Sequence, residues 1–358
     1  MTNRLRPKSL WMVFSLAVVF LAADHASAQE AKLQKLGGGR FMTESVREFP
    51  VAGLNTIRVV GPSNLGGSLT VTTHPGSTAR FDMVKVFKVG SERTASDFER
   101  YIEFAIDTAG SSLTLDVRSE TGAPWEGSDQ SARIELTLIL PPDMNFEFRG
   151  RFFEMDLAGP FRRVDVQTEY GKVKVADVGE RMRLVGDYTA IEAVRTRGEI
   201  IAQTSYADLV LRDAIPSAEH SARLLNQYGS ILVEKLAGSV VAETENAPIS
   251  LSDVVLLGSG SNLRAANAAI KVSIKEFSNA QLDVSNSNGT VNLEVPSALS
   301  ARLNCTVGAG GSISTSGLIV QTHPDLIASN HLEGLCGDGK GTIDIDVSGP
   351  GQIGIQGE

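Results

Sequence analysis

Seven dipeptides recur at near-constant spacing through the second half of this chain, and each precedes a short segment in which apolar and polar residues alternate. Their first residues are Tyr170, Tyr188, Tyr206, Tyr228, Asn246, Asn267 and Asn288. The successive spacings are 18, 18, 22, 18, 21 and 21 residues. A sustained period of about 20 residues predicts a solenoid, in which each repeat buries its apolar residues only by stacking on its neighbours.

Small branched residues occupy alternate positions inside these repeats. Examples are Ile231 with Val233, Ile249 with Leu251, Ile270 with Val272, and Val291 with Leu293. Alternation with a period of two residues is typical of a strand that buries one face. The pattern therefore predicts an all-β chain whose short strands form the walls of a narrow β-solenoid.

The recurring Tyr and Asn positions predict two ladders along the solenoid. Stacked strands lie about 4.8 Å apart, so equivalent side chains of successive repeats come into contact. We expect a hydrogen-bonded ladder of Asn246, Asn267 and Asn288. Exposed aromatic rings can stack on sugar faces, and this makes the tyrosines the candidate ligand-binding residues: Tyr170, Tyr188, Tyr206 and Tyr228. The alternative is that these rings only pack on one another across the repeats.

The first half of the chain is less regular but shows the same alternation. We predict strands at 56–60, 68–72, 80–86, 112–117 and 134–140. Between them, Phe98, Tyr101 and Ile102 have the spacing of an amphipathic helix. Residues 94–102 are therefore predicted to form a short helical insertion in an otherwise all-β body.

Composition divides the chain into a leader, a lead-in and one long domain. Residues 29–40 are polar, include three consecutive glycines, and are predicted to be a flexible lead-in. The β-solenoid domain is expected at 41–358, with a less regular part at 41–150, regular repeats at 151–300 and a capping region at 301–358. Within the capping region, 342–347 and 352–355 are expected to be closing strands.

Residues 1–28 have the pattern of a signal peptide. Three basic residues precede an apolar stretch that is too short to span a membrane, and Ala26-Ser27-Ala28 matches a cleavage site. An uncleaved anchor is the alternative. No second long apolar run follows, so we predict an exported protein without a transmembrane segment in the mature chain. It would reside in the periplasm, at the cell surface or outside the cell.

The charge of the chain argues against two classes of partner. The net charge is −9 at pH 7, and removal of the basic leader makes the mature chain more acidic still. Nucleic acid and anionic lipid both require a basic surface, so neither is expected to bind.

The chain has two cysteines, Cys305 and Cys336. An even count in an exported protein predicts one structural disulfide between them. Two unpaired, buried thiols are the alternative. Zinc binding would require further ligands at a recognised spacing, and none is present.

The search for catalytic residues identifies no cofactor or metal site and no catalytic set. No nucleophile elbow, zinc-binding helix or Ser-His-Asp pattern is recognisable, so we predict a protein that is not an enzyme. The glycine-rich stretch 334–341 resembles a phosphate-binding loop but has Gly341 where Ser or Thr is needed. The alternative catalytic set is Asp187, Asp208 and Asp213 on adjacent repeats, near Arg195, Arg197 and Arg212; the competing interpretation is that these are solvent-facing charges.

The chain resembles the putative-adhesin family of bacterial exported proteins. The likeness rests on the alternating strand before Pro141-Pro142, the repeated Thr/Ser-x-Tyr/Asn-Gly/Ala-x-Ile/Val units, and the final Gly349-Pro350-Gly351 segment, and it covers about 41–355. The resemblance implies a single-stranded, right-handed parallel β-helix, and it brings no catalytic residues with it.

These observations predict an exported, non-enzymatic, adhesin-like binding module whose partners are glycans or envelope proteins. A carbohydrate-active β-helix enzyme that uses the aspartates is one alternative. A structural scaffold that self-associates is the other.

Overall fold

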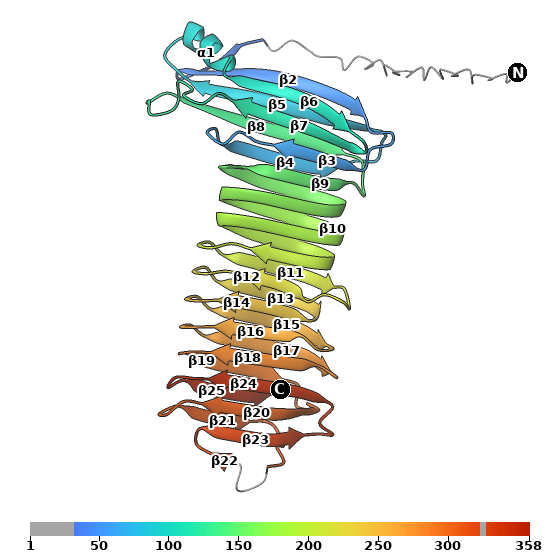
Figure 1. The fold of residues 1–358 in the computed structure, drawn as a ribbon, viewed down its shortest axis with the longest axis vertical. Coiled ribbons are helices and arrows are strands. Elements are labelled where there is room, and N and C mark those ends of the chain that lie inside the picture. The colour runs from blue at the N-terminus through green and yellow to red at the C-terminus, as the bar shows by residue number, and fades with distance from the viewer. Residues whose placement is uncertain (1–31, 323–326) are drawn as a thin grey trace, which may run out of the picture.

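The computed structural model describes residues 32–322 and 327–358, so the predicted signal peptide at 1–28 lies outside the described residues. The described chain is all-β, as predicted, with 25 strands joined in one sheet and one short helix. The strands lie in layers stacked along the long axis of the molecule (Figure 1). The sheet is mixed, because parallel pairs in the middle give way to antiparallel pairs near both ends. A purely parallel arrangement is therefore wrong for the ends.

The middle of the chain forms the regular part of the stack. Its first strand, β10, is continuous over 51 residues and winds through several layers (Figure 1). The strands are β10 (Phe153–Gln203), β11 (Leu209–Pro216), β12 (Ala222–Leu225), β13 (Ile231–Gly238), β14 (Val240–Thr244), β15 (Ile249–Leu257), β16 (Ser261–Ala265), β17 (Ile270–Ser278), β18 (Gln281–Asn286) and β19 (Thr290–Val295).

From β11 to β17, each strand pairs in parallel with the strand two places further along the chain. On one wall β11, β13, β15, β17 and β19 are neighbours, and on the other β12, β14, β16 and β18 are neighbours. The register places one fully buried column of side chains along the first wall: Leu209, Ile231, Ile249, Ile270 and Val291. Burial of each such side chain contributes about 1.5–3 kcal/mol. The predicted period-two core is therefore confirmed.

The N-terminal part interleaves segments that are distant in sequence. Its elements are β1 (Gln34–Gly37), β2 (Arg40–Pro50), β3 (Thr56–Val60), β4 (Gly67–Thr73), β5 (Thr78–Lys88), α1 (Glu92–Glu99), β6 (Ile102–Ala109), β7 (Ser112–Ser119), β8 (Ser131–Leu140) and β9 (Asn145–Arg151). The five predicted strands are all present. However, β3 lies between β7 and β9, and β4 between β8 and β10, so an early segment is inserted between later ones.

Antiparallel strands complete this end. β5 pairs with β8 and β2, while β6 pairs with β7. β1 pairs with β2, so part of the predicted flexible lead-in is an ordered edge strand. The predicted helix is present as α1, which begins after Ser91, whose side chain accepts a hydrogen bond from the Thr94 amide. Ile102 belongs to β6 instead of the helix.

The C-terminal part is interleaved in a similar way. Its strands are β20 (Ala301–Val307), β21 (Ser312–Ser316), β22 (Ile327–Ala328), β23 (His331–Cys336), β24 (Gly341–Val347) and β25 (Gln352–Gly357). β24 pairs in parallel with both β18 and β20, and β25 with both β19 and β21. The two predicted closing strands therefore lie inside the stack, one layer before β20 and β21 (Figure 1).

The predicted disulfide is wrong. Cys305 and Cys336 are free thiols, and both are buried. In the antiparallel pair of β20 and β23, Cys305 is opposite Leu332, whereas Cys336 is opposite Ala301. That register separates the cysteines by four strand positions, or about 13 Å along the strand, whereas a disulfide requires Cα atoms within about 7 Å. Burial raises the pKa of the Cys305 thiol to about 12 and also raises that of Cys336.

Helix α1 is tied to the sheet by a buried lysine. Lys85 of β5 is 7% exposed, and its ammonium donates to Glu99 Oε1 and to the Ile102 carbonyl, each at 2.7 Å. Phe98 packs beneath the helix against Phe87 and Trp125. The contact holds the last residues of α1 and the start of β6 against the antiparallel end of the sheet.

The lysine contact predicts a stability loss for Lys85→Met, which keeps the apolar stem but removes the charge. We expect about 2 kcal/mol of destabilisation in urea unfolding, because the Ile102 carbonyl loses its donor while Glu99 stays partly hydrated. Lys88→Met, on the exposed end of the same strand, is the control and should change stability by less than about 0.5 kcal/mol. Equal effects of the two variants would contradict the role of Lys85.

The free cysteines predict a clear result in thiol titration. In the folded protein at pH 8 neither thiol should react with a disulfide-exchange reagent, because both are buried and their pKa values are raised. In denaturant without reductant, two thiols per chain should react. A count of zero in denaturant would show that the bridge forms after all.

Candidate functional site

The tyrosines of the repeats form one continuous aromatic stack at a corner of the layers. Ring centroids are 5.0 Å apart for Tyr170 and Tyr188, 4.4 Å for Tyr188 and Tyr206, and 4.8 Å for Tyr206 and Tyr228, with interplanar angles of 6–15°. Phe152 adds a fifth ring, 5.2 Å from Tyr170. We call these five residues the aromatic ladder. Sequence reasoning missed Phe152, although its spacing of 18 residues from Tyr170 was an available signal.

The three inner rings of the ladder expose their edges to solvent and not their faces. The five residues are 41–49% exposed, so the stack stands out as a ridge. Because the rings are nearly parallel and in van der Waals contact, each inner ring has both faces covered by its neighbours. The expectation that sugar rings stack on these faces is therefore corrected for the inner rings. A ligand can instead reach the ring edges and the phenolic oxygens.

The stack offsets backbone strain at this corner. Phe152, Tyr170 and Tyr188 have φ values of 62°, 56° and 53°, in the left-handed region. This conformation costs a bulky residue about 1–2 kcal/mol. A stacked aromatic pair contributes about 0.5–1.5 kcal/mol beyond its buried area, which is of the same size. Desolvation, with a further contribution from Tyr206, raises the pKa of the Tyr188 phenol.

The same corner continues as the predicted asparagine ladder. The side-chain amide of Asn267 donates to Asn246 Oδ1 at 3.1 Å, and that of Asn288 donates to Asn267 Oδ1 at 3.3 Å. Hydrogen bonds thus replace ring stacking as the contact between layers. The aromatic part of the corner presents larger exposed side chains, so it is the better candidate for ligand contact.

A second, inward-facing set of polar side chains supports the corner and was not predicted. These residues lie two positions before a ladder residue and hydrogen bond to backbone carbonyls at the corner. They are Thr204, Asn226, Thr244 and Asn286. Buried backbone groups need such partners, which explains why Thr or Asn recurs two residues before Tyr or Asn.

The sizes of two corner positions compensate for one another. A Cβ atom on Gly229 would lie 2.1 Å from the Ala207 carbonyl oxygen and 2.7 Å from Asn226 Nδ2, so the neighbouring backbone and the large inner Asn226 together require glycine. In the layer of Tyr188 the sizes are reversed: Thr189 is fully buried, and a Cβ on Gly186 would lie 2.6 Å from its Cβ. In the sequence, this is visible as a small residue paired with a larger one three positions later in one repeat (Gly186 and Thr189), and the reverse order in another (Asn226 and Gly229).

An open hollow of about 520 Å³ runs beside the aromatic ladder. It is lined by the residues just before the ladder in four successive layers and by the end of β3. The polar lining includes Arg149, Arg151, Gln167, Glu169, Asp187 and Gln203. The Arg151 guanidinium lies 5.3 Å from the Phe152 ring centroid and bonds to Glu169 at 2.8 Å, which joins the hollow to the ridge. We call this hollow the ladder trough.

A second corner lies seven residues after the ladder and carries alternating charges. Its residues all have φ values of 52–62° and are Asp177, Arg195, Asp213, Lys235 and Asp253. Arg195 makes two hydrogen bonds to Asp177, at 2.6 and 2.7 Å, which lower the pKa of that carboxyl. The Arg195–Asp177 pair joins two neighbouring layers, and we therefore interpret this corner as structural.

The three aspartates of the alternative catalytic set are not brought together. Asp187 precedes the ladder corner and lines the trough, whereas Asp208 follows the corner and accepts hydrogen bonds from Ser230. Asp213 lies at the second corner, where it lines a separate hollow. Arg212, one of the expected partners, pairs with Glu192 and Glu234 instead. The competing interpretation, solvent-facing charges, describes Arg212 and Asp208 better.

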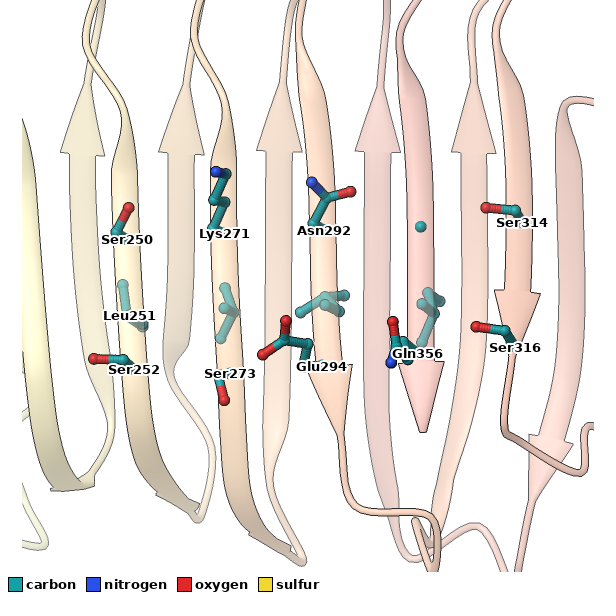
Figure 2. A pocket seen from close by; sticks show the side chains of 14 residues that line it. Ser250, Leu251, Ser252, Lys271, Ser273, Asn292, Glu294, Ser314, Ser316 and Gln356 are labelled. Atoms are coloured by element: carbon teal, nitrogen blue, oxygen red, sulfur yellow. The ribbon is translucent and has the colours of Figure 1, made fainter. Parts of the chain in front are cut away.

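Another hollow, of about 570 Å³, lies on the outer face of β15, β17, β19, β25 and β21 (Figure 2). Short polar side chains such as Ser250, Ser252 and Ser314 project from the strands, while Leu251 points into the core. Gly354 deepens the surface between Asn292 and Ser314. No aromatic ladder borders this hollow, whereas the ladder trough lies beside one.

Two further findings concern metals and membranes. Across residues 32–322 and 327–358, no group of three or more His, Cys, Asp or Glu side chains is arranged to hold a metal ion. In the same residues, no helix is sufficiently long and apolar to cross a membrane.

Comparisons with known proteins give matches in structure only. No protein-family model matches the chain, and no curated protein matches it either. A protein described as a "putative cell adhesion protein" from Clostridium sporogenes matches over 88% of this chain and 100% of its own, with 9% identity and a TM-score of 0.25.

Two other solved structures are similar to the same extent. A "putative adhesin" from Parabacteroides distasonis has 11% identity and a TM-score of 0.28, and another from Bacteroides fragilis has 9% identity and a TM-score of 0.26. Each covers 87% of this chain and 96% of its own. TM-scores of this size carry no argument about the ladder or its ligand.

The size compensation at the corner predicts the behaviour of Gly186→Thr. The new side chain would clash with Thr189, so we expect about 1–3 kcal/mol of destabilisation in urea unfolding. The double variant Gly186→Thr with Thr189→Ala recreates the Thr204 and Ala207 combination found one layer further on, and it should recover most of the loss. A double variant that is no more stable than Gly186→Thr alone would disprove the compensation.

Proposed function

We propose that this chain is an exported, non-catalytic, adhesin-like binding module that contacts its ligand through the aromatic ladder. The main observation in support of this proposal is that five stacked aromatic residues remain 41–49% exposed along one corner. An exposed row of large aromatic side chains is unusual on a soluble surface and often marks a binding site. The protein would be located in the periplasm, at the cell surface or in the extracellular space.

The proposal includes a single-stranded, right-handed parallel β-solenoid as the scaffold. Support comes from the parallel pairing of each central strand with the equivalent strand of the next repeat. Right-handed crossovers are strongly preferred between parallel strands. Such a scaffold holds the ladder in one geometry before the ligand binds, which reduces the entropy lost on association.

Glycans and envelope proteins are the partners that we propose. The ridge offers apolar ring edges and a row of phenolic oxygens, which suits hydroxyl-rich or mixed polar surfaces. The net charge of −9 disfavours nucleic acid and anionic lipid. No cofactor is part of the proposal.

Replacement of ladder tyrosines by phenylalanine tests this function without removal of the stack. The double variant Tyr188→Phe with Tyr206→Phe keeps both rings but removes two hydroxyl groups. If the ridge binds the ligand, affinity for the bound glycan or envelope component should fall roughly tenfold, since each hydrogen bond contributes about 0.5–1.5 kcal/mol. The thermal midpoint should change little.

The control for this experiment is Tyr101→Phe, which makes the same chemical change away from the ladder, beside Trp125. It should leave affinity unchanged. If the ladder variant binds with unchanged affinity, the tyrosine hydroxyl groups do not belong to the binding site. Release of reducing ends from any polysaccharide in the same wells would support the carbohydrate-active enzyme instead.

A further inference from the structure

The ladder trough contains buried polar atoms that the protein leaves without partners. Among the described residues, eight buried side-chain polar atoms have no hydrogen-bond partner, and two of them are Arg151 Nε and Asp187 Oδ1, from residues that line this trough. Thr168 Oγ1 is a third such atom, but Thr168 is buried in the inward-facing column of the corner. Each such group costs about 1–3 kcal/mol when it is left unsatisfied. Their concentration in one hollow beside an exposed ridge is an indication of a binding site.

The trough repeats with the step of the layers. Arg149 and Arg151 are in register with Gln167 and Glu169 in the next layer, and Val185 with Asp187, then Gln203 with Ser205, follow at the same spacing in sequence. Successive layers are about 4.8 Å apart. Polar side chains therefore recur along the trough at a step close to the width of one pyranose ring. A polymer that lies along the stack would meet similar contacts at each unit.

The chemistry of the trough favours a polysaccharide over a peptide strand. An extended peptide binds by adding to free backbone groups at a sheet edge. The trough lies on a sheet face, where the backbone groups are already used in pairing between layers. Only side chains are available there, and amide, carboxylate and guanidinium groups are suited to sugar hydroxyls.

The charges of the trough favour a neutral polymer. Two arginines, Arg149 and Arg151, are balanced by Glu169 and Asp187, and Arg151 is already paired with Glu169. No net charge remains to attract an anionic chain, and the net charge of −9 on the whole protein would repel one.

We infer that the ladder trough binds a neutral, extended polysaccharide that lies along the axis of the stack, with its sugar edges against the ring edges of the ladder. This inference rests on the proposed function and specifies its ligand class and orientation. Hydroxyl groups of the polymer bond to the exposed amides of Gln167 and Gln203, which contact units on different layers. The opposite side of the ladder takes no part.

Binding of the mature chain, residues 29–358, to purified polysaccharides tests the inference. The probes are soluble neutral glucans, mannans and xylans, with polygalacturonate and alginate as anionic polymers. We expect binding to at least one neutral polymer and at least tenfold weaker binding to both anionic ones. With an oligosaccharide series from the bound polymer, affinity should rise up to four or five units, which matches the four trough layers and five rings. A plateau at two units would show that the polymer crosses the stack.

The variant Gln167→Ala with Gln203→Ala removes two exposed side chains of the trough and should weaken binding roughly tenfold. The matched control, Asn292→Ala with Gln356→Ala, removes two exposed amides from the other hollow (Figure 2) and should have no effect.

If the tyrosine variants weaken binding but the glutamine variant does not, the trough inference fails while the proposed function stands. Absence of binding to every polysaccharide, together with capture of an envelope protein, overturns the inference alone. Absence of both overturns the proposed function as well.

Discussion

In-register parallel pairing between successive layers is the constraint on which the rest of this structure depends. It fixes a constant step along the axis, so every position in a repeat becomes a column of like side chains. Inside, the columns are branched apolar residues that exclude water. Outside, they become an aromatic ladder, an asparagine ladder and a line of alternating charges. Each side chain must therefore also pack against the equivalent side chains in the layers on both sides of it. This restricts the residue types that are allowed at each position of the repeat.

The aromatic corner shows how inner and outer columns depend on one another. Inner Thr and Asn side chains hold the corner carbonyls, and the residue after the ladder position must fit between the inner side chain and the backbone of the neighbouring layer. The outer rings stack and offset the left-handed backbone of Phe152, Tyr170 and Tyr188. Both sets therefore act on the same turn of backbone. If the ridge binds the extended ligand that we propose, this bracing reduces the entropy lost on association.

The ends of the stack are built on a different plan from its middle. At each end a segment is inserted between layers that are distant from it in sequence, and antiparallel strands then close the sheet. Contacts between distant segments are slow to form, so both ends are expected to be ordered after the central layers. Antiparallel pairing at the ends also occupies strand edges of the stack that would otherwise be free to pair with another molecule.

The sequence by itself determined the all-β class, the strands of the regular repeats, the buried period-two core and both corner ladders, because these follow from local alternation and a fixed period. Helical spacing also indicated a short helix at 94–102, whereas the structure begins α1 earlier, after the capping residue Ser91. Only the tertiary structure decided the places of β3–β4 and β24–β25, since the same alternating pattern fits any layer of the stack. The register of β20 against β23 separated Cys305 from Cys336, and cysteine count alone could not show this. The ladder trough likewise arises only when residues about 18 positions apart in sequence are stacked. Which of its polar atoms are buried without a hydrogen-bond partner depends on contacts between layers, and these are not visible in the local sequence.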